Sequence, residues 1–161
     1  MNICIRHPEK SDGEKIWKLI HDTGGLDLNS SYCYFMLAEY FSFTCAIAED
    51  SDSDEVKGFI SAFRKPDAAD TLFVWQVCVA GDTQGQGVAG QMIRFILTAN
   101  PDIQNIETTV GPSNVASNAL FCSVAKRLNS EVNKDVFLDK KEFTIGVHET
   151  ELLYKIGPFK N

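Results

Sequence analysis

Three closely spaced glycines, Gly85, Gly87 and Gly90, carry the clearest chemical signal in the sequence. They follow the apolar segment 72–79, which is typical of a buried strand, and they open the amphipathic segment 88–99, which is typical of a helix. A strand, a glycine turn and a helix in this order leave backbone N–H groups free at the positive end of the helix dipole. The pattern therefore predicts a phosphate-binding site that needs no basic side chain.

Two kinds of phosphate ligand have to be weighed for this turn. Residues 85–90 read literally as G-x-G-x-x-G, the dinucleotide fingerprint, and Glu107 lies near the distance expected for its acidic residue. Against a nicotinamide cofactor, the turn comes late in the chain, the chain is too short for two mononucleotide-binding halves, and Glu107 falls inside the next expected strand. A nucleoside triphosphate is not supported either, because the sequence contains no G-x-x-x-x-G-K-[ST].

The elements that must position the turn are predicted from apolar periodicity and from glycine and proline breaks. Ser11 is expected to cap the first helix with Glu14 as its capping-box partner. Expected strands cover 3–6, 42–49, 56–64, 72–79, 106–110, 131–138 and 144–156, and expected helices cover 11–21, 31–40, 88–99 and part of 111–129. Hairpin-linked strands in the middle favour antiparallel pairing, and the later strand–helix–strand unit favours a parallel pair. The prediction is a single α/β (α+β) domain over 1–161, with a mixed, mostly antiparallel central sheet flanked by helices.

The amino-acid composition indicates which kinds of ligand the protein is expected to bind. The net charge of −7 and the pI of about 4.9 argue against an electrostatic nucleic-acid binder, which would show a basic stripe. The charge suits a cationic small substrate, or simply solubility. No metal site is expected, since His7, His21 and His148 share no ligand spacing.

Cysteine usage and hydropathy bear on the compartment. The 5 cysteines are odd in number and form no C-x-x-C pair, so reduced thiols and a cytoplasmic protein are expected. No signal peptide is visible, and no apolar run approaches the roughly 18 residues that a membrane span requires.

Two motifs resemble the GCN5-related N-acetyltransferase (GNAT) family. Residues 84–89 (QGQGVA) resemble its Q/R-x-x-G-x-G/A pyrophosphate loop, and residues 114–121 (NVASNALF) resemble its second motif, N-x-x-[AS]-x-x-L-[YF]. The resemblance implies the GNAT fold, with acetyl-CoA as co-substrate and with backbone N–H groups on the central strand holding the acetyl carbonyl oxygen. Asn114 suits helix capping as well as pantetheine or adenosine contact. The implied acetyl-CoA-binding residues are Val77, Val79, Gln84, Gly85, Gln86, Gly87, Val88, Ala89, Asn114 and Ser117.

Three further segments resemble the diaminobutyrate acetyltransferase subfamily of ectoine synthesis. Residues 26–34 (LDLNSSYCY) are similar to its LD-x-NS-x-Y-x-Y segment, residues 148–151 (HETE) to its H-E-x-E segment, and residues 74–77 (VWQV) to its central strand. The resemblance implies acetylation of the gamma-amine of L-2,4-diaminobutyrate, giving N-gamma-acetyl-2,4-diaminobutyrate, by a homodimer. It also implies a substrate site formed by Asp27, Tyr32, Trp75, His148 and Glu151.

Amide formation from a thioester requires a neutral amine, so a base must take the ammonium proton. Acidic side chains are expected at both amines of the substrate, and Asp27 and Glu151 are the candidates. Glu151 is the expected base, directly or through water, and Trp75 and Tyr32 are the other expected catalytic residues. Three of these residues also have a purely structural interpretation. Glu151 suits an exposed strand carboxylate, Asp27 suits an Asx-turn or a cap, and Trp75 suits a core position. For His148, a structural or exposed histidine is favoured over a second base or an orienting group.

One position departs from the family pattern. Many members protonate the departing thiolate with a tyrosine where this chain has Phe121. Either another group such as Tyr32 or Tyr34 donates the proton, or the thiolate leaves unassisted. Two alternatives for function therefore stay open: acetylation of another small amine, and a non-catalytic acyl-CoA-binding sensor module.

Overall fold

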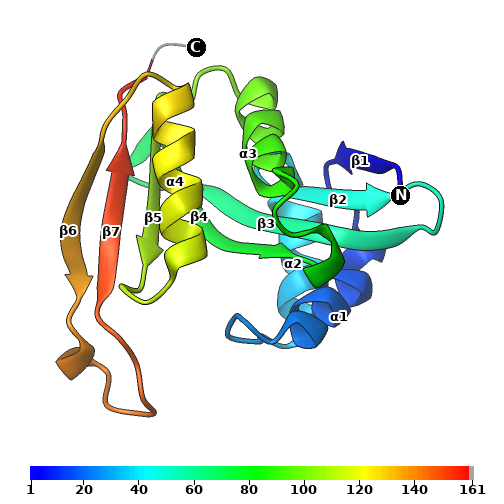
Figure 1. The fold of residues 1–161 in the computed structure, drawn as a ribbon, viewed down its shortest axis with the longest axis horizontal. Coiled ribbons are helices and arrows are strands. Elements are labelled where there is room, and N and C mark those ends of the chain that lie inside the picture. Colours follow the sequence, from blue (N-terminus) through cyan, green and yellow to red (C-terminus); the bar gives the residue numbers. More distant parts are fainter. Residues whose placement is uncertain (160–161) are drawn as a thin grey trace. The chain divides into compact units, whose positions relative to one another are not determined.

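A computed structural model describes residues 1–159 (Figure 1). Its contacts group the chain into two compact units, with unit 1 formed by Met1–Phe63 and Trp75–Pro101, and unit 2 formed by Arg64–Val74 and the residues from Asp102 onward. The strands are β1 Ile3–Arg6, β2 Ala46–Asp50, β3 Glu55–Lys65, β4 Ala68–Val79, β5 Asn105–Val110, β6 Val132–Leu138 and β7 Glu151–Ile156. The α-helices are α1 Gly13–Thr23, α2 Ser31–Tyr40, α3 Val88–Ala99 and α4 Val115–Arg127.

The order of elements agrees with the sequence prediction throughout. The seven strands follow the order β1-β2-β3-β4-β5-β7-β6 in a mixed sheet, so the predicted fold class is confirmed. The helices expected at 31–40 and 88–99 have the expected limits. The strand–helix–strand unit gives the expected parallel pair, with Leu72 of β4 opposite Ile106 of β5.

The cap expected at the start of the first helix is wrong. Ser11 lies inside a short 3-10 helix, and α1 begins only after Asp12. The Asp12 carboxylate accepts hydrogen bonds from Glu9 N at 2.7 Å and from the Arg6 guanidinium at 2.8 and 3.0 Å. The hydrogen bonds from Arg6 of β1 therefore hold this turn at Asp12, and Ser11 does not act as the cap.

Two expected strands are shorter than predicted. Residues 42–44 form a 3-10 turn because the N–H groups of Thr44 and Cys45 bond back to Phe41 O, so β2 starts at Ala46. The last strand starts at Glu151 rather than at residue 144. Gly146, with a φ of +78°, interrupts extended backbone before it.

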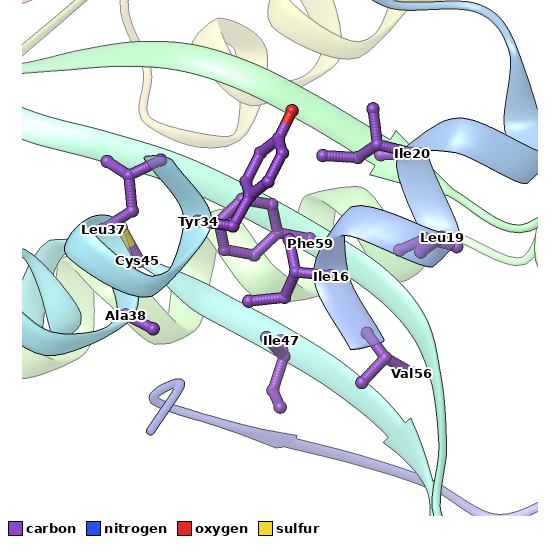
Figure 2. Packing of buried hydrophobic residues seen from close by; sticks show 11 residues of the cluster. Ile16, Leu19, Ile20, Tyr34, Leu37, Ala38, Cys45, Ile47, Val56 and Phe59 are labelled. Atoms are coloured by element: carbon purple, nitrogen blue, oxygen red, sulfur yellow. The ribbon is translucent and has the colours of Figure 1, made fainter. Parts of the chain in front are cut away.

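The core of unit 1 joins α1 and α2 to one face of its strands. Ile16 of α1, Tyr34 of α2 and Phe59 of β3 are fully buried together, and the Tyr34 and Phe59 rings meet edge to face at 6.2 Å (Figure 2). Side chains of this size typically contribute about 1.5–3 kcal/mol each when buried. On the other face α3 packs closely, since a Cβ on Gly58 would lie 2.9 Å from Met92 Cε.

Unit 2 pairs β5 with β7 and β7 with β6, both antiparallel. The α4 helix buries Phe121 and Val124, and its Asn118 accepts a hydrogen bond from the Tyr154 hydroxyl of β7 at 2.8 Å. Lys134 of β6 donates to the same Asn118 oxygen at 2.9 Å. These contacts fix α4 against the β6–β7 hairpin of unit 2.

Two general expectations can be compared with the structure. All five cysteines are free thiols, as predicted, and burial raises the pKa of Cys45 to about 12. Within residues 1–159, no helix is long and apolar enough to span a bilayer.

Candidate functional site

The glycine turn of unit 1 has the backbone that its sequence requires. A short 3-10 helix at Gly81–Thr83 follows β4, and α3 starts at Val88. Gly85 and Gly87 adopt φ angles of +77° and +76°, in the left-handed region that side-chain-bearing residues avoid. Both glycines are therefore needed for the shape of the turn.

The turn leaves a continuous set of backbone donors free, as predicted. No N–H group of residues 85–90 donates to another residue of the described chain, and the first bond of α3 runs from Gln91 N to Gly87 O at 3.1 Å. Free N–H groups at the positive end of a helix dipole suit an anionic group. The residues present therefore fit a pyrophosphate without a basic side chain.

The polar side chains of the turn are used to hold its shape. Gln84 Nε2 donates to Val79 O and Gln86 Nε2 donates to Asp82 O, both at 3.0 Å. Lys57 Nζ of β3 bonds the Asp82 carboxylate at 3.0 Å. Hydrogen bonds to Glu55 and Asp82 raise the pKa of Lys57 to about 12, so this cation stays charged and keeps the turn in place.

The end of β4 carries the residues expected to meet the acetyl group. The β4–β5 register runs from Thr71 to Val74, so the backbones of Val77 and Val79 lie beyond that ladder. Trp75 is 44% exposed, which rules out the core position that its apolar segment left open. Its indole is accessible for contact with a ligand.

Asp27 lies on the exposed connection between α1 and α2, and its backbone is held by a residue that the sequence analysis did not assign. Gln76 of β4, only 5% exposed, donates from Nε2 to Asp27 O at 3.0 Å, while Gln76 N donates to Ser61 Oγ at 3.1 Å. Gln76 Oε1 is buried and has no hydrogen-bond partner among residues 1–159. The Asp27 carboxylate is itself free of partners in the described chain and open to solvent.

The two candidate tyrosines of α2 differ sharply. Tyr32 is 69% exposed, whereas Tyr34 is fully buried and its hydroxyl accepts a hydrogen bond from Asn29 N at 3.3 Å. Tyr34 therefore serves the core and the 24–30 connection. Tyr32 is the accessible hydroxyl of the pair.

In unit 2, the H-E-T-E segment leads directly into β7. The exposed His148 stacks on Phe143 with ring centroids 4.2 Å apart. Glu149 accepts hydrogen bonds from Ser113, which immediately precedes Asn114. Glu151 is the first residue of β7, is partly exposed, and its carboxylate makes no hydrogen bond or ion pair within residues 1–159.

Asn114 is the N-cap of α4, since its side chain accepts a hydrogen bond from Ser117 N at 3.0 Å. The capping role weighed in the sequence analysis is therefore present. Phe121, at the place of the family's tyrosine, is buried in the core of unit 2 and has no proton to donate. The structure thus separates the site residues by unit: Asp27, Tyr32, Trp75, Val77, Val79 and the turn 84–89 belong to unit 1, and Asn114, Ser117, His148 and Glu151 belong to unit 2.

A cavity of about 480 Å³ in unit 1 lies between α1, the start of β3 and the end of β4, with Gly81 and Gln84 on its wall. Its lysines are matched by carboxylates, since Lys18 pairs with Asp22 at 2.7 Å and Lys57 pairs with Glu55 and Asp82. No cluster of three or more metal-ligating side chains occurs among the described residues.

Comparison with known proteins places this chain in a family. Residues 14–123 match the model of the acetyltransferase (GNAT) family. The chain belongs to the GNAT acetyltransferase family. Membership decides between the two interpretations of the G-x-G-x-x-G pattern, and the dinucleotide alternative is set aside.

Relatives of this GNAT protein are similar over nearly its whole length. The chain is 42% identical to the L-2,4-diaminobutyric acid acetyltransferase of Methylotuvimicrobium alcaliphilum, over 98% of this chain and 92% of the relative. It is 39% identical to the enzyme of the same name from Streptomyces coelicolor, over 98% and 94%.

Solved structures give the same picture. The fold matches diaminobutyrate acetyltransferase EctA from Paenibacillus lautus, solved in complex with its substrate L-2,4-diaminobutyric acid and coenzyme A, with a TM-score of 0.93, 45% identity and coverage of 99% and 97%. The ribosomal-protein-S18-alanine N-acetyltransferase of Escherichia coli shares the fold at a TM-score of 0.73 and 13% identity, with coverage of 99% and 96%.

Proposed function

We propose that this GNAT protein transfers the acetyl group of acetyl-CoA to the gamma-amine of L-2,4-diaminobutyrate. The product is N-gamma-acetyl-2,4-diaminobutyrate, a step of ectoine synthesis and so of the response to osmotic stress. The observation that carries the proposal is 45% identity over 99% of the chain to an enzyme solved with that diamino acid and CoA. The free donors of the 85–90 turn supply an independent physical reason, because they fit the pyrophosphate of CoA.

We assign acetyl-CoA to the residues that the resemblance to the GNAT family implies. The free N–H groups of residues 85–89 hold the pyrophosphate, while Gln84, whose N–H donates to Ala80 O at 3.0 Å, shapes the turn. Asn114 and Ser117 contact the pantetheine or adenosine part. The backbone N–H groups of Val77 and Val79 receive the acetyl carbonyl oxygen. Donors preorganised around a developing oxyanion typically lower the activation free energy by about 3 kcal/mol.

On the family resemblance, diaminobutyrate is assigned to Asp27, Tyr32, Trp75, His148 and Glu151. The substrate carries two amines, which suits two carboxylates that have no partner in the described chain. Asp27 binds one ammonium group, and the exposed Trp75 ring supplies an apolar wall. His148 orients the substrate while its ring stays stacked on Phe143.

Glu151 is assigned the role of base, directly or through one water. It takes a proton from the gamma-ammonium, and the neutral nitrogen attacks the acetyl carbonyl carbon. The nitrogen of the tetrahedral intermediate then loses its second proton to solvent, the C–S bond breaks, and CoA leaves as the thiolate. Since Phe121 cannot donate a proton, the exposed Tyr32 hydroxyl is the candidate donor, and an unassisted thiolate is the alternative.

The protein is further proposed to act as a cytoplasmic homodimer. The homodimer follows from the family resemblance. The location follows from cysteine usage, since the five cysteines are odd in number, form no C-x-x-C pair and are all free thiols. Sedimentation equilibrium at several protein concentrations measures the assembly. A mass equal to that of one 17.9 kDa chain at all concentrations would refute the dimer.

Thiol release by the purified protein tests the substrate. Acetyl-CoA is mixed with L-2,4-diaminobutyrate, ornithine, lysine or 2,3-diaminopropionate in parallel. We expect the highest kcat/KM with diaminobutyrate. Faster release with another amine would keep the reaction class and refute the substrate. CoA binding without release with any amine would favour a sensor module.

A further inference from the structure

Glu149 lies between two segments that the proposed function assigns to different substrates. Its Oε2 accepts a hydrogen bond from Ser113 Oγ at 2.6 Å, and its Oε1 accepts one from Ser113 N at 3.2 Å. Ser113 immediately precedes Asn114, the N-cap of α4. Glu149 itself stands in the H-E-T-E segment, two residues before Glu151. One side chain therefore ties the turn before α4 to the start of β7.

The turn is shaped to receive this carboxylate. A Cβ on Gly111 would lie 2.7 Å from Glu149 Oε2, closer than two such atoms can approach. The φ angle of Gly111 is outside the left-handed region, so a Cβ at this position would act only by displacing the end of the Glu149 side chain. The carboxylate thus lies close against the backbone at Gly111, in addition to its two hydrogen bonds with Ser113.

Glu149 and Glu151 have different tasks. Both oxygens of Glu149 accept hydrogen bonds, and such bonds to a charged carboxylate are about twice as strong as neutral ones. The carboxylate of Glu151 has no partner within residues 1–159 and is free to meet an amine. Glu149 is therefore suited to hold its neighbours in place, and Glu151 to receive a proton.

We propose that Glu149 is a positioning residue that links the CoA-binding turn at Asn114 to the diamine-binding segment at His148–Glu151. The inference rests on the proposed function for the identity of the two substrates. Loss of the link lets the Asn114 turn and Glu151 move independently. Both the affinity for acetyl-CoA and the rate of the chemical step then fall, although Glu149 touches neither substrate.

The test is a double-mutant cycle of Glu149→Ala and Ser113→Ala, with steady-state kinetics below the melting temperature of every variant. Glu149→Ala is expected to raise KM for acetyl-CoA and to lower kcat, each about tenfold, as the loss of hydrogen bonds to a charged group implies. Ser113→Ala is expected to give part of the same loss. The double variant is expected to be no worse than Glu149→Ala, because coupled residues are not additive. Glu149→Gln keeps one acceptor oxygen for Ser113 N and offers an amide N–H to Ser113 Oγ, but it loses the charge, so it is expected to recover only part of the activity.

Glu142→Ala is the matched control. Glu142 lies in the same connection, and its carboxylate also accepts a backbone N–H, from Asp139 at 2.7 Å. It does not touch the turn before α4, so KM and kcat are expected to stay within twofold of wild type. The proposal is overturned if Glu149→Ala changes only the melting temperature, if it changes the kinetics no more than Glu142→Ala, or if the losses of Glu149→Ala and Ser113→Ala simply add.

Calorimetry with CoA alone separates this inference from the proposed function. Wild-type protein that binds CoA but does not acetylate diaminobutyrate would refute the proposed substrate. Weaker CoA binding by Glu149→Ala would in that case still support the link to the Asn114 turn. CoA binding as tight as in the wild type would overturn the link.

Discussion

At the scale of single residues, the same side-chain type takes different roles according to its partners. Glu149 is bound through both oxygens to Ser113, and Glu151, two residues later, has no partner in the described chain. Trp75 is exposed on a strand whose residues 72–79 are apolar except for Gln76. These differences follow from partners far along the chain, which explains why residue types alone left each role open.

Replacement of Glu151 by glutamine removes the proposed base and keeps its shape. We expect Glu151→Gln to lower kcat about 100-fold, in the range usual for a general base, with CoA affinity unchanged. Thiol release and calorimetry measure the two quantities. Glu131→Gln, at an exposed position, is the control. Wild-type turnover by Glu151→Gln would remove Glu151 from this role.

Gln76 is expected to act on the diamine through the backbone of Asp27. Gln76→Met keeps the length of the side chain and loses the bond from Nε2 to Asp27 O, a loss of about 1 kcal/mol. We expect KM for diaminobutyrate to rise about fivefold and KM for acetyl-CoA to stay within twofold. The exposed Gln104→Met is the control. Equal changes in both KM values would argue against a role specific to the diamine.

At the scale of elements, the site depends on how turns and strand ends are held. The prediction of a strand, a glycine turn and a helix at 72–99 succeeded because every signal is local: apolar spacing, glycine breaks and a free helix N-terminus. The late start of the last strand, at Glu151 and not at residue 144, could not be predicted in the same way. It depends on Gly146 and on the hydrogen bond that Ser113 donates to Glu149. Ser113 and Glu149 lie 36 positions apart in the sequence.

Gly87→Val tests the turn. A β-branched residue at a φ of +76° is strained by about 1–3 kcal/mol, although only Gln91 Nε2, at 4.0 Å, approaches the added Cβ. The backbone is therefore expected to shift, and CoA binding measured by calorimetry to weaken at least about tenfold. Gly81→Ala, where φ is ordinary and no atom lies within 4 Å, is the control. Wild-type CoA affinity in Gly87→Val would mean that the turn is wrongly assigned.

The Arg6–Asp12–Glu49 cluster predicts acid sensitivity of unit 1. Burial alone would raise the pKa of Asp12, but hydrogen bonds from Arg6 and Glu9 and the Arg6 charge lower it below its ordinary 3.8. A hydrogen bond from Arg6 likewise lowers the pKa of Glu49. A lowered folded-state pKa stabilises the fold above the ordinary value, and this contribution is lost as the pH falls through the folded value. Asp12→Asn is therefore expected to cost about 2 kcal/mol at pH 7.

The measurement for this cluster is the melting temperature from pH 7 down to pH 2. At pH 7 the Asp12→Asn variant is expected to melt about 5 °C below wild type, the shift that this loss gives in a chain of this size. The gap is expected to narrow below about pH 4, when the wild-type carboxylate is protonated too. A gap that stays constant over the whole range would show that the Asp12 charge does not contribute.

At the scale of the whole molecule, the sequence alone was enough for the family, the order of elements and the class of reaction. Local motifs at 84–89, 114–121, 26–34 and 148–151 carried that information, and the family match agrees with it. The contacts that hold the site residues in place could not be predicted from the sequence. The bond from Gln76 to Asp27 joins residues 49 positions apart, which no local pattern encodes. The single domain over 1–161 and the homodimer stay predictions.

The most direct measurement of the central claim is the structure of the product. Purified protein is incubated with equimolar acetyl-CoA and L-2,4-diaminobutyrate, thiol release is followed to completion, and the product is examined by two-dimensional NMR. We expect one thiol released per acetyl group transferred, with the acetyl carbonyl correlated to the gamma-nitrogen. Absence of thiol release above the blank, or acetylation at the alpha-nitrogen, would contradict the account.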